Sequence, residues 1–162
     1  MQDGSTLDGS LFGEPQPCFG CAPAHPTGFR LRFTREGDAV TTKFTPTEHH
    51  QGPPGIMHGG LVMALADELG AWAIIGLLEQ FGFTADFSGK LHSPVRVGEE
   101  VVGRARIAKP GTRVVSVEVE LQQGDVLRYT SALRFVILDE AGAERILGQP
   151  LPEAWRRFGR KA

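Results

Sequence analysis

Apolar and polar residues alternate along most of this chain. The alternation is clearest between residues 114 and 121, where valine or leucine occupies every second position from Val115 to Leu121 and Ser116, Glu118 and Glu120 lie between them. A period of two is typical of a strand with one buried face. The same pattern predicts strands at 29–35, 39–44, 84–93, 100–108 and 126–138. We therefore expect about six strands, the last three joined by short turns into an antiparallel meander.

One apolar run interrupts this alternation. From Leu61 onward about twenty residues contain no proline and are rich in leucine and alanine, which predicts a long helix. Between Leu61 and Leu78 the only charged residues are Asp67 and Glu68. A helix that is apolar on nearly every side belongs in a protein interior. We expect an α+β fold in which a curved antiparallel sheet wraps around one long central helix. The run has the length of a membrane span, but its two acids and its glycines favour a buried helix.

The two acids need an explanation, because burying an ionised carboxylate costs several kcal/mol without a partner. Successive helix residues point about 100° apart, so Asp67 and Glu68 cannot share one role. Gly59 and Gly60 are expected to open the helix, where the first N–H groups have no partner within the helix. Those N–H groups form a site for an anion or a carbonyl oxygen.

One helix cannot bring its own first turn and Asp67 to the same reacting atom. Gly60 and Asp67 share a face of the helix, but about 10 Å separates them along its axis. An antiparallel second copy of the helix would bring the two features together. We therefore expect a homodimer with a shared site, assembled further as a dimer of dimers (a homotetramer).

Three residues near this helix each allow two interpretations. His58 either bonds the loop or transfers protons. Gln51 and the histidines beside it either lie in a solvated loop or hold the substrate carbonyl or the attacking water. Thr84 either bonds that water or the carboxylate, or is simply a β-branched strand residue.

Cys18 and Cys21 have the C-x-x-C spacing. Structural thiols in a turn, a metal held between two chains, and redox chemistry all remain open. A closed zinc site needs four ligands, and only His25 lies nearby. Two prolines in this segment argue against a redox motif at a helix start. We expect structural thiols, with no metal and no cofactor.

Composition narrows the classes of protein that fit. The 162 residues are 41% hydrophobic and 22% charged with a net charge of −2, as in ordinary globular chains. Acidic and basic residues are mixed without a basic run, so we expect no nucleic-acid partner. The start lacks the apolar core of a signal peptide, so we expect a cytoplasmic protein without a membrane partner. We divide the chain into a flexible arm (1–17), a single domain (18–138) and a C-terminal extension (139–162) that lays Trp155 and Phe158 on the body.

Several of these features also match a known family. The run His58-Gly59-Gly60, with Asp67 nine positions after the histidine, resembles the hotdog-fold acyl-CoA thioesterases of the phenylacetate-degradation (PaaI-like) type. Further matching segments are 18–21, 26–31, 51–56 and 84–94. The similarity covers roughly Cys18 to Ile137, most of the chain.

The resemblance implies a hotdog fold and the hydrolysis of acyl-CoA to free acid and CoA. It implies that Asp67 is the acidic catalytic residue, acting as nucleophile or general base. The N–H of Gly59 would polarise the thioester carbonyl. Glu68 is the alternative acid, because it follows Gly60 by the same eight positions that separate Asp67 from Gly59. Two other functions stay open on this fold: a non-catalytic acyl-CoA-binding module and an enoyl-CoA hydratase or dehydratase.

The sequence departs from the family at one position. Relatives carry an amide side chain six positions before the histidine, where this chain has Gly52, with Gln51 one position earlier. Candidates to meet the CoA phosphates are Lys90, Arg104, Arg106, Lys109 and Arg113. Candidates to contact the acyl group are Met63, Leu69 and Trp72.

Overall fold

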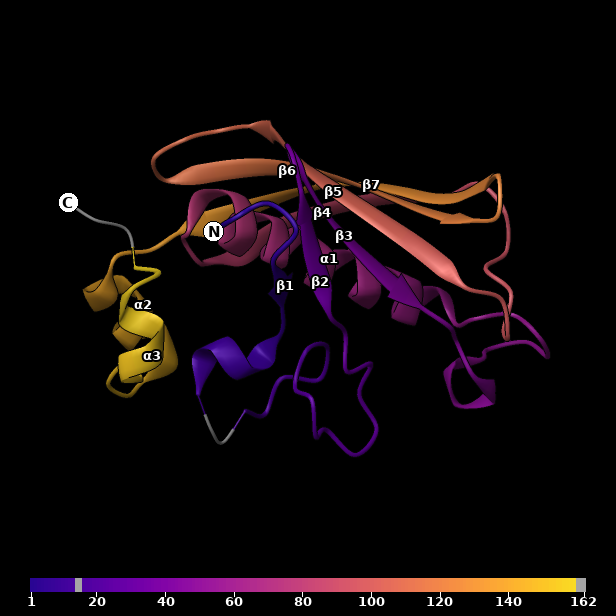
Figure 1. The fold of residues 1–162 in the computed structure, drawn as a ribbon, viewed down its shortest axis with the longest axis horizontal. Helices are drawn as coiled ribbons and strands as arrows, with labels where there is room; N and C mark the ends of the chain where they lie inside the picture. The colour runs from indigo at the N-terminus through magenta and orange to yellow at the C-terminus, as the bar shows by residue number, and fades with distance from the viewer. Residues whose placement is uncertain (14–15, 160–162) are drawn as a thin grey trace.

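A long central helix, α1 (Gly59–Leu78), lies against an antiparallel sheet in the computed structural model, which describes residues 1–13 and 16–159 (Figure 1). The strands are β1 (Thr6–Leu7), β2 (Phe33–Glu36), β3 (Ala39–Phe44), β4 (Gly82–Leu91), β5 (Val101–Lys109), β6 (Val114–Gln123) and β7 (Val126–Ile137). The 3-10 turns η1 (Gly9–Phe12) and η2 (Glu48–His50) and the helices α2 (Glu140–Leu147) and α3 (Glu153–Arg156) complete the order. The predicted α+β class, with a sheet around one helix, is confirmed.

The sheet has the strand order β1-β2-β3-β5-β6-β7-β4, and every neighbouring pair is antiparallel. Strands β5, β6 and β7 form the predicted meander, and Val117 of β6 pairs with Leu133 of β7 on the buried face. Strand β4 pairs only with β7, so it forms one edge of the sheet. The first predicted strand was placed too early: it begins at Phe33, because Arg30 has a φ of 54° and interrupts the extended chain.

Helix α1 fills the concave side of the sheet. Leu65, Leu69 and Trp72 are almost completely buried there. The helix approaches the sheet closely at Gly76, where a Cβ would lie 2.8 Å from Val40 Cγ2. Among the helices of the described chain, α1 alone is long and apolar enough to cross a membrane, by length and composition. Its packing against the sheet is that of a core helix.

Residues near both termini pack together on the body of the domain. We expected a flexible arm at 1–17, but within its described part β1 pairs with β2 and Phe12 is buried. The Phe12 ring lies 5.7 Å from that of Trp72 of α1, 4.7 Å from that of Trp155 and 5.3 Å from that of Phe158. Trp155 and Phe158 therefore lie on the body, as expected, while the division into arm, domain and extension stays a prediction.

Candidate functional site

The first turn of α1 offers one free backbone donor. The Nδ1 atom of His58 accepts a hydrogen bond from the N–H of Gly60 at 3.0 Å, and the carbonyl of His58 accepts from Leu61 and Val62. Among the described residues, the N–H of Gly59 has no acceptor. We expected both glycine N–H groups to be free, but the His58 cap occupies that of Gly60. The His58 imidazole thus bonds the helix start, and its role in proton transfer stays a prediction.

Gln51 lies beside this helix start, away from Asp67 in the same chain. Its backbone bridges to Met57, and its side-chain Oε1 accepts from the N–H of Gly55 at 3.1 Å. The side chain is exposed and braces the loop in this arrangement.

Asp67 is half-buried and bonded to Thr84 of β4. The Thr84 hydroxyl donates to Asp67 Oδ1 at 2.7 Å, so Thr84 has the bonding role among its two interpretations. The register of β4 shifts between Thr84 and Asp86, an irregularity that re-aims side chains locally. Burial raises the pKa of Asp67, and the Thr84 hydrogen bond lowers it in part. Within the described chain Asp67 has no cation partner, so the carboxylate is held by one neutral donor.

Glu68 has a different set of partners. Its Oε1 accepts from Trp72 Nε1 at 3.1 Å, and the Cys18 thiol lies 3.4 Å and 3.6 Å from its two oxygens. The two adjacent acids thus point to different neighbours, as helical geometry requires.

Both carboxylates nevertheless border one pocket of about 320 Å³. Its apolar wall includes aromatic side chains from near both ends of the chain, from α1, and from the start of β4 and the residue just before it: Phe12, Trp72, Phe81, Phe83 and Trp155. Thr84, Cys18 and Cys21 also line it. A larger hollow of about 430 Å³ lies over β4, β6 and β7, and neither acid borders it.

Of the three side chains expected to contact the acyl group, only Trp72 borders this pocket. Leu69 is buried in the core, and Met63 is 39% exposed. The contributions of Phe12 and Trp155 were not foreseen, because no local pattern indicates that segments about 140 positions apart meet.

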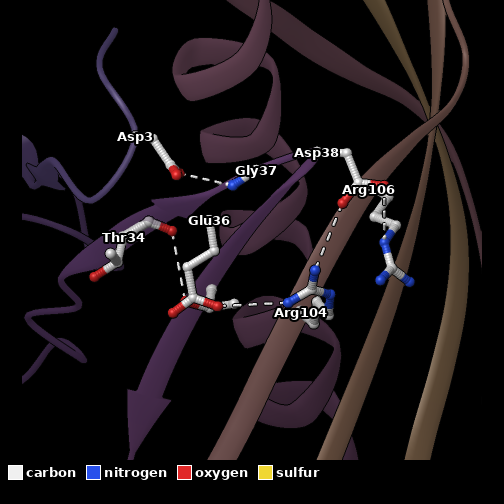
Figure 2. A network of polar contacts seen from close by, with 8 residues as sticks. Asp3, Thr34, Glu36, Gly37, Asp38, Arg104 and Arg106 are labelled. Atoms are coloured by element: carbon white, nitrogen blue, oxygen red, sulfur yellow. Dashed lines mark hydrogen bonds and ion pairs between the residues drawn. The ribbon is translucent and has the colours of Figure 1, made fainter.

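The arginines proposed for CoA phosphates are largely engaged elsewhere. Arg104 lies 3.5 Å from Glu36 and 3.6 Å from Asp38, and Arg106 lies 3.5 Å from Asp38, at the β2–β3 turn (Figure 2). In the described chain the three remaining candidates form no ion pair: Lys90, Lys109 and Arg113.

Comparison with known sequences shows which proteins this chain resembles. Residues 54–129 match the family model of the thioesterase superfamily. The chain is 32% identical over 75 residues to acyl-coenzyme A thioesterase 13 of Mus musculus, covering 46% of this chain and 54% of that protein. It is 30% identical over 88 residues to a putative esterase of Deinococcus radiodurans, covering 54% of this chain and 59% of that protein. The chain thus spans little more than half the length of these curated relatives.

Solved structures of the superfamily share the fold. A thioesterase superfamily protein superposes with a TM-score of 0.66 at 22% identity, covering 74% of this chain and 63% of that one. A hypothetical thioesterase from Streptococcus pneumoniae, solved with coenzyme A, superposes with a TM-score of 0.59 at 14% identity, covering 62% of this chain and 81% of that one. The matched segment holds α1 with Asp67 and Thr84 of β4, and the architecture around them is the superfamily's hotdog fold. This chain is thus similar to the thioesterase superfamily, in sequence over residues 54–129 and in the fold of its sheet and central helix.

Proposed function

We propose that this protein hydrolyses acyl-CoA thioesters to free acid and CoA, as a PaaI-like thioesterase. The observation that carries the proposal is the half-buried Asp67 carboxylate, held by Thr84 at the edge of an apolar pocket. The match of residues 54–129 to the thioesterase superfamily model and the similarity to a protein named acyl-coenzyme A thioesterase 13 support this reaction. The structural neighbour solved with coenzyme A supports coenzyme A as the thiol part of the substrate.

Thioester hydrolysis needs a carboxylate and a hydrogen-bond donor that stabilises the developing oxyanion. In the proposed mechanism the N–H of Gly59 donates to the carbonyl oxygen as negative charge develops there, and one such donor contributes about 3–4 kcal/mol. Asp67 either attacks the carbonyl carbon or removes a proton from the attacking water. The CoA thiolate then leaves and takes up a proton, which Asp67 returns if it has acted as the base. If Asp67 has attacked directly, water then hydrolyses the acyl–Asp67 anhydride and frees the acid. The bond from Thr84 favours the ionised form of Asp67, which both routes require.

One chain does not assemble this pair of groups. Gly59 and Asp67 are eight residues apart on α1, which separates them by about 12 Å along the helix axis. We propose that a second copy supplies the missing partner, so that each site combines Asp67 of one chain with Gly59 of the other.

The edge strand β4 supports such a dimer. Along α1, β4 runs in the opposite direction: Thr84 contacts Asp67, and Leu91 lies near Gly59, whose ideal Cβ would be 3.6 Å from Leu91 Cδ1. Antiparallel pairing of two β4 edges, with Thr84 opposite the Leu91 end, would bring Asp67 of each chain toward Gly59 of the other. An unpaired strand edge is a ready surface for such pairing, and most β4 residues are exposed in the single chain.

The pocket favours a compact acyl group. Its volume of about 320 Å³ lies at the lower end of the range for ligand sites. We therefore propose short-chain or single-ring acyl groups as substrates, in preference to long fatty acyl chains.

A panel of acyl-CoA thioesters, assayed by thiol release, tests the reaction. We expect turnover of compact acyl-CoA, a fall in kcat of about 10²–10⁴-fold in Asp67→Asn, and little change in acyl-CoA binding measured by calorimetry. Wild-type protein that binds acyl-CoA without turnover would instead identify a binding module. Hydration of enoyl-CoA in place of hydrolysis would identify a hydratase.

Mixed dimers test the shared site. A dimer of one Asp67→Asn chain and one Gly59→Ala chain, isolated with two affinity tags, contains one intact and one doubly altered site if the site is shared. It should then keep about half of the wild-type activity. Loss of activity in both sites would show that each chain holds its own, and a monomer by light scattering at assay concentration would exclude the dimer.

A further inference from the structure

Three metal-ligating side chains meet beside the proposed active site. Single ligand atoms of Cys18, Cys21 and Glu68 all lie within 4.8 Å of one another. The Cys18 sulfur is 3.4 Å and 3.6 Å from the two Glu68 oxygens. In tetrahedral zinc sites, with Zn–S near 2.3 Å and Zn–O near 2.0–2.2 Å, a sulfur and an oxygen ligand lie about 3.6 Å apart. The ligands therefore already have zinc-like spacing.

The loop that carries the cysteines is pressed against Glu68. The N–H of Cys21 donates to Cys18 Sγ at 3.4 Å, and backbone bonds from Phe29 to Phe19 and from Leu31 to Gly20 hold the loop. A Cβ on Gly20 would lie 2.4 Å from the Glu68 carboxyl carbon. The absence of a side chain at this position lets both cysteines reach the carboxylate.

The Glu68 carboxylate and the two cysteines of this cluster favour a bound cation. Glu68 is half-buried, and within the described chain its partners are an indole N–H and a thiol, with no cation. A partly buried carboxylate without a positive partner is costly. Cysteine binds a metal ion as the thiolate, and its proton is released when the ion binds.

We propose that Cys18, Cys21 and Glu68 bind one Zn²⁺ per chain. Binding releases the thiol protons to solvent and leaves a fourth coordination position facing the pocket that all three side chains line. The ion fastens the loop 16–31 to the middle of α1. His25 is not among the ligands, because neither of its ring nitrogens belongs to the group of ligand atoms that lie within 4.8 Å of one another.

This assignment differs from the expectation of structural thiols without a metal, because Glu68 supplies a ligand that lies fifty positions from Cys18 in the sequence. The assignment also gives Asp67 and Glu68 different roles. Glu68 is committed to the metal, which leaves Asp67 as the carboxylate for the proposed hydrolysis. The inference does not rest on that reaction, since zinc binding is measured without turnover.

Metal analysis of the full-length, reduced protein tests the proposal. Wild type, Cys18→Ser, Cys21→Ser and Glu68→Gln are loaded with Zn²⁺, desalted and assayed by mass spectrometry, and their affinities are compared by competition with a chromophoric chelator. Asp67→Asn is the matched control, because it alters the neighbouring acid. We expect one zinc per chain in wild type and in the control, and an affinity lowered by roughly 100-fold in each ligand variant. Co²⁺ in wild type should show thiolate charge-transfer absorption and tetrahedral bands.

Two further measurements cover variants that fail to fold. Zn²⁺ should raise the Tm of wild type and of Asp67→Asn, and it should protect the cysteines of wild type from alkylation. The proposal is overturned if reduced wild type retains no zinc, if zinc leaves alkylation unchanged, or if Cys18→Ser binds as tightly as wild type. Wild-type protein that holds its zinc but hydrolyses no acyl-CoA would count against the proposed reaction and not against the metal site.

Discussion

Replacing Thr84 with valine removes one hydroxyl from the candidate site and nearly preserves the shape of the side chain. That hydroxyl donates to Asp67 Oδ1 at 2.7 Å. Because the carboxylate form accepts this bond, the bond lowers the pKa of Asp67 against the effect of burial. Removing it should raise that pKa further.

The size of the effect follows from the strength of the bond. A hydrogen bond to a charged group contributes about 1.5–3 kcal/mol, and one pKa unit corresponds to about 1.36 kcal/mol. Asp67 is only partly buried, so water replaces some of the lost interaction and the lower end applies. We therefore expect the acid limb of the kcat/KM profile to move upward by about one pH unit.

The assay follows CoA release with a disulfide reagent that reports thiols in acidic as well as neutral buffer. Thr84→Ser is the matched control, because it keeps the hydroxyl and should keep the wild-type acid limb. Well above the pKa of Asp67, the valine variant should approach wild-type activity, since the carboxylate is then ionised in both proteins. An acid limb that is identical in Thr84→Val and wild type, in an enzyme that Asp67→Asn inactivates, would refute this reasoning.

Three further substitutions test separate parts of the structure. Burial raises the pKa of Asp67 above its ordinary value of 3.8, so the folded protein loses stability as pH rises through the folded-state pKa. Asp67→Asn should therefore raise the free energy of unfolding in urea more at neutral pH than in acid. An equal effect at both pH values would contradict this. In Gly59→Ala the new Cβ meets only Leu91 Cδ1, at 3.6 Å, so the free energy of unfolding in urea should rise by about 0.5–1 kcal/mol. In contrast, kcat/KM should fall by about 10²-fold, because the methyl group displaces the thioester carbonyl. Unchanged kinetics would exclude the Gly59 N–H as the donor. In Gly20→Ala the Cβ would lie 2.4 Å from the Glu68 carboxyl carbon. We expect the free energy of unfolding to fall by about 1–3 kcal/mol and zinc binding to weaken. A variant with the melting temperature and zinc affinity of wild type would argue against the close contact.

The sequence alone determined the central helix, six of the seven strands in the described sheet and the fold class. The apolar run predicted α1 to within two residues of its observed start, and the alternation Val115 to Leu121 predicted the buried face of β6. These predictions succeed because helix and strand periods are local properties, imposed by backbone geometry on a chain that must bury one face. The sequence also showed that the helix-start glycines and Asp67 lie on one helix, because their spacing is a local property of that helix.

Only the tertiary structure decided which of these groups meet. The His58 cap removes the N–H of Gly60 and leaves that of Gly59, and Thr84 bonds Asp67 because β4 runs beside α1. The loop of Cys18 reaches Glu68 from fifty positions away. Such contacts are set by how whole elements pack, and packing depends on the summed shape of many side chains, for which the sequence carries no local pattern.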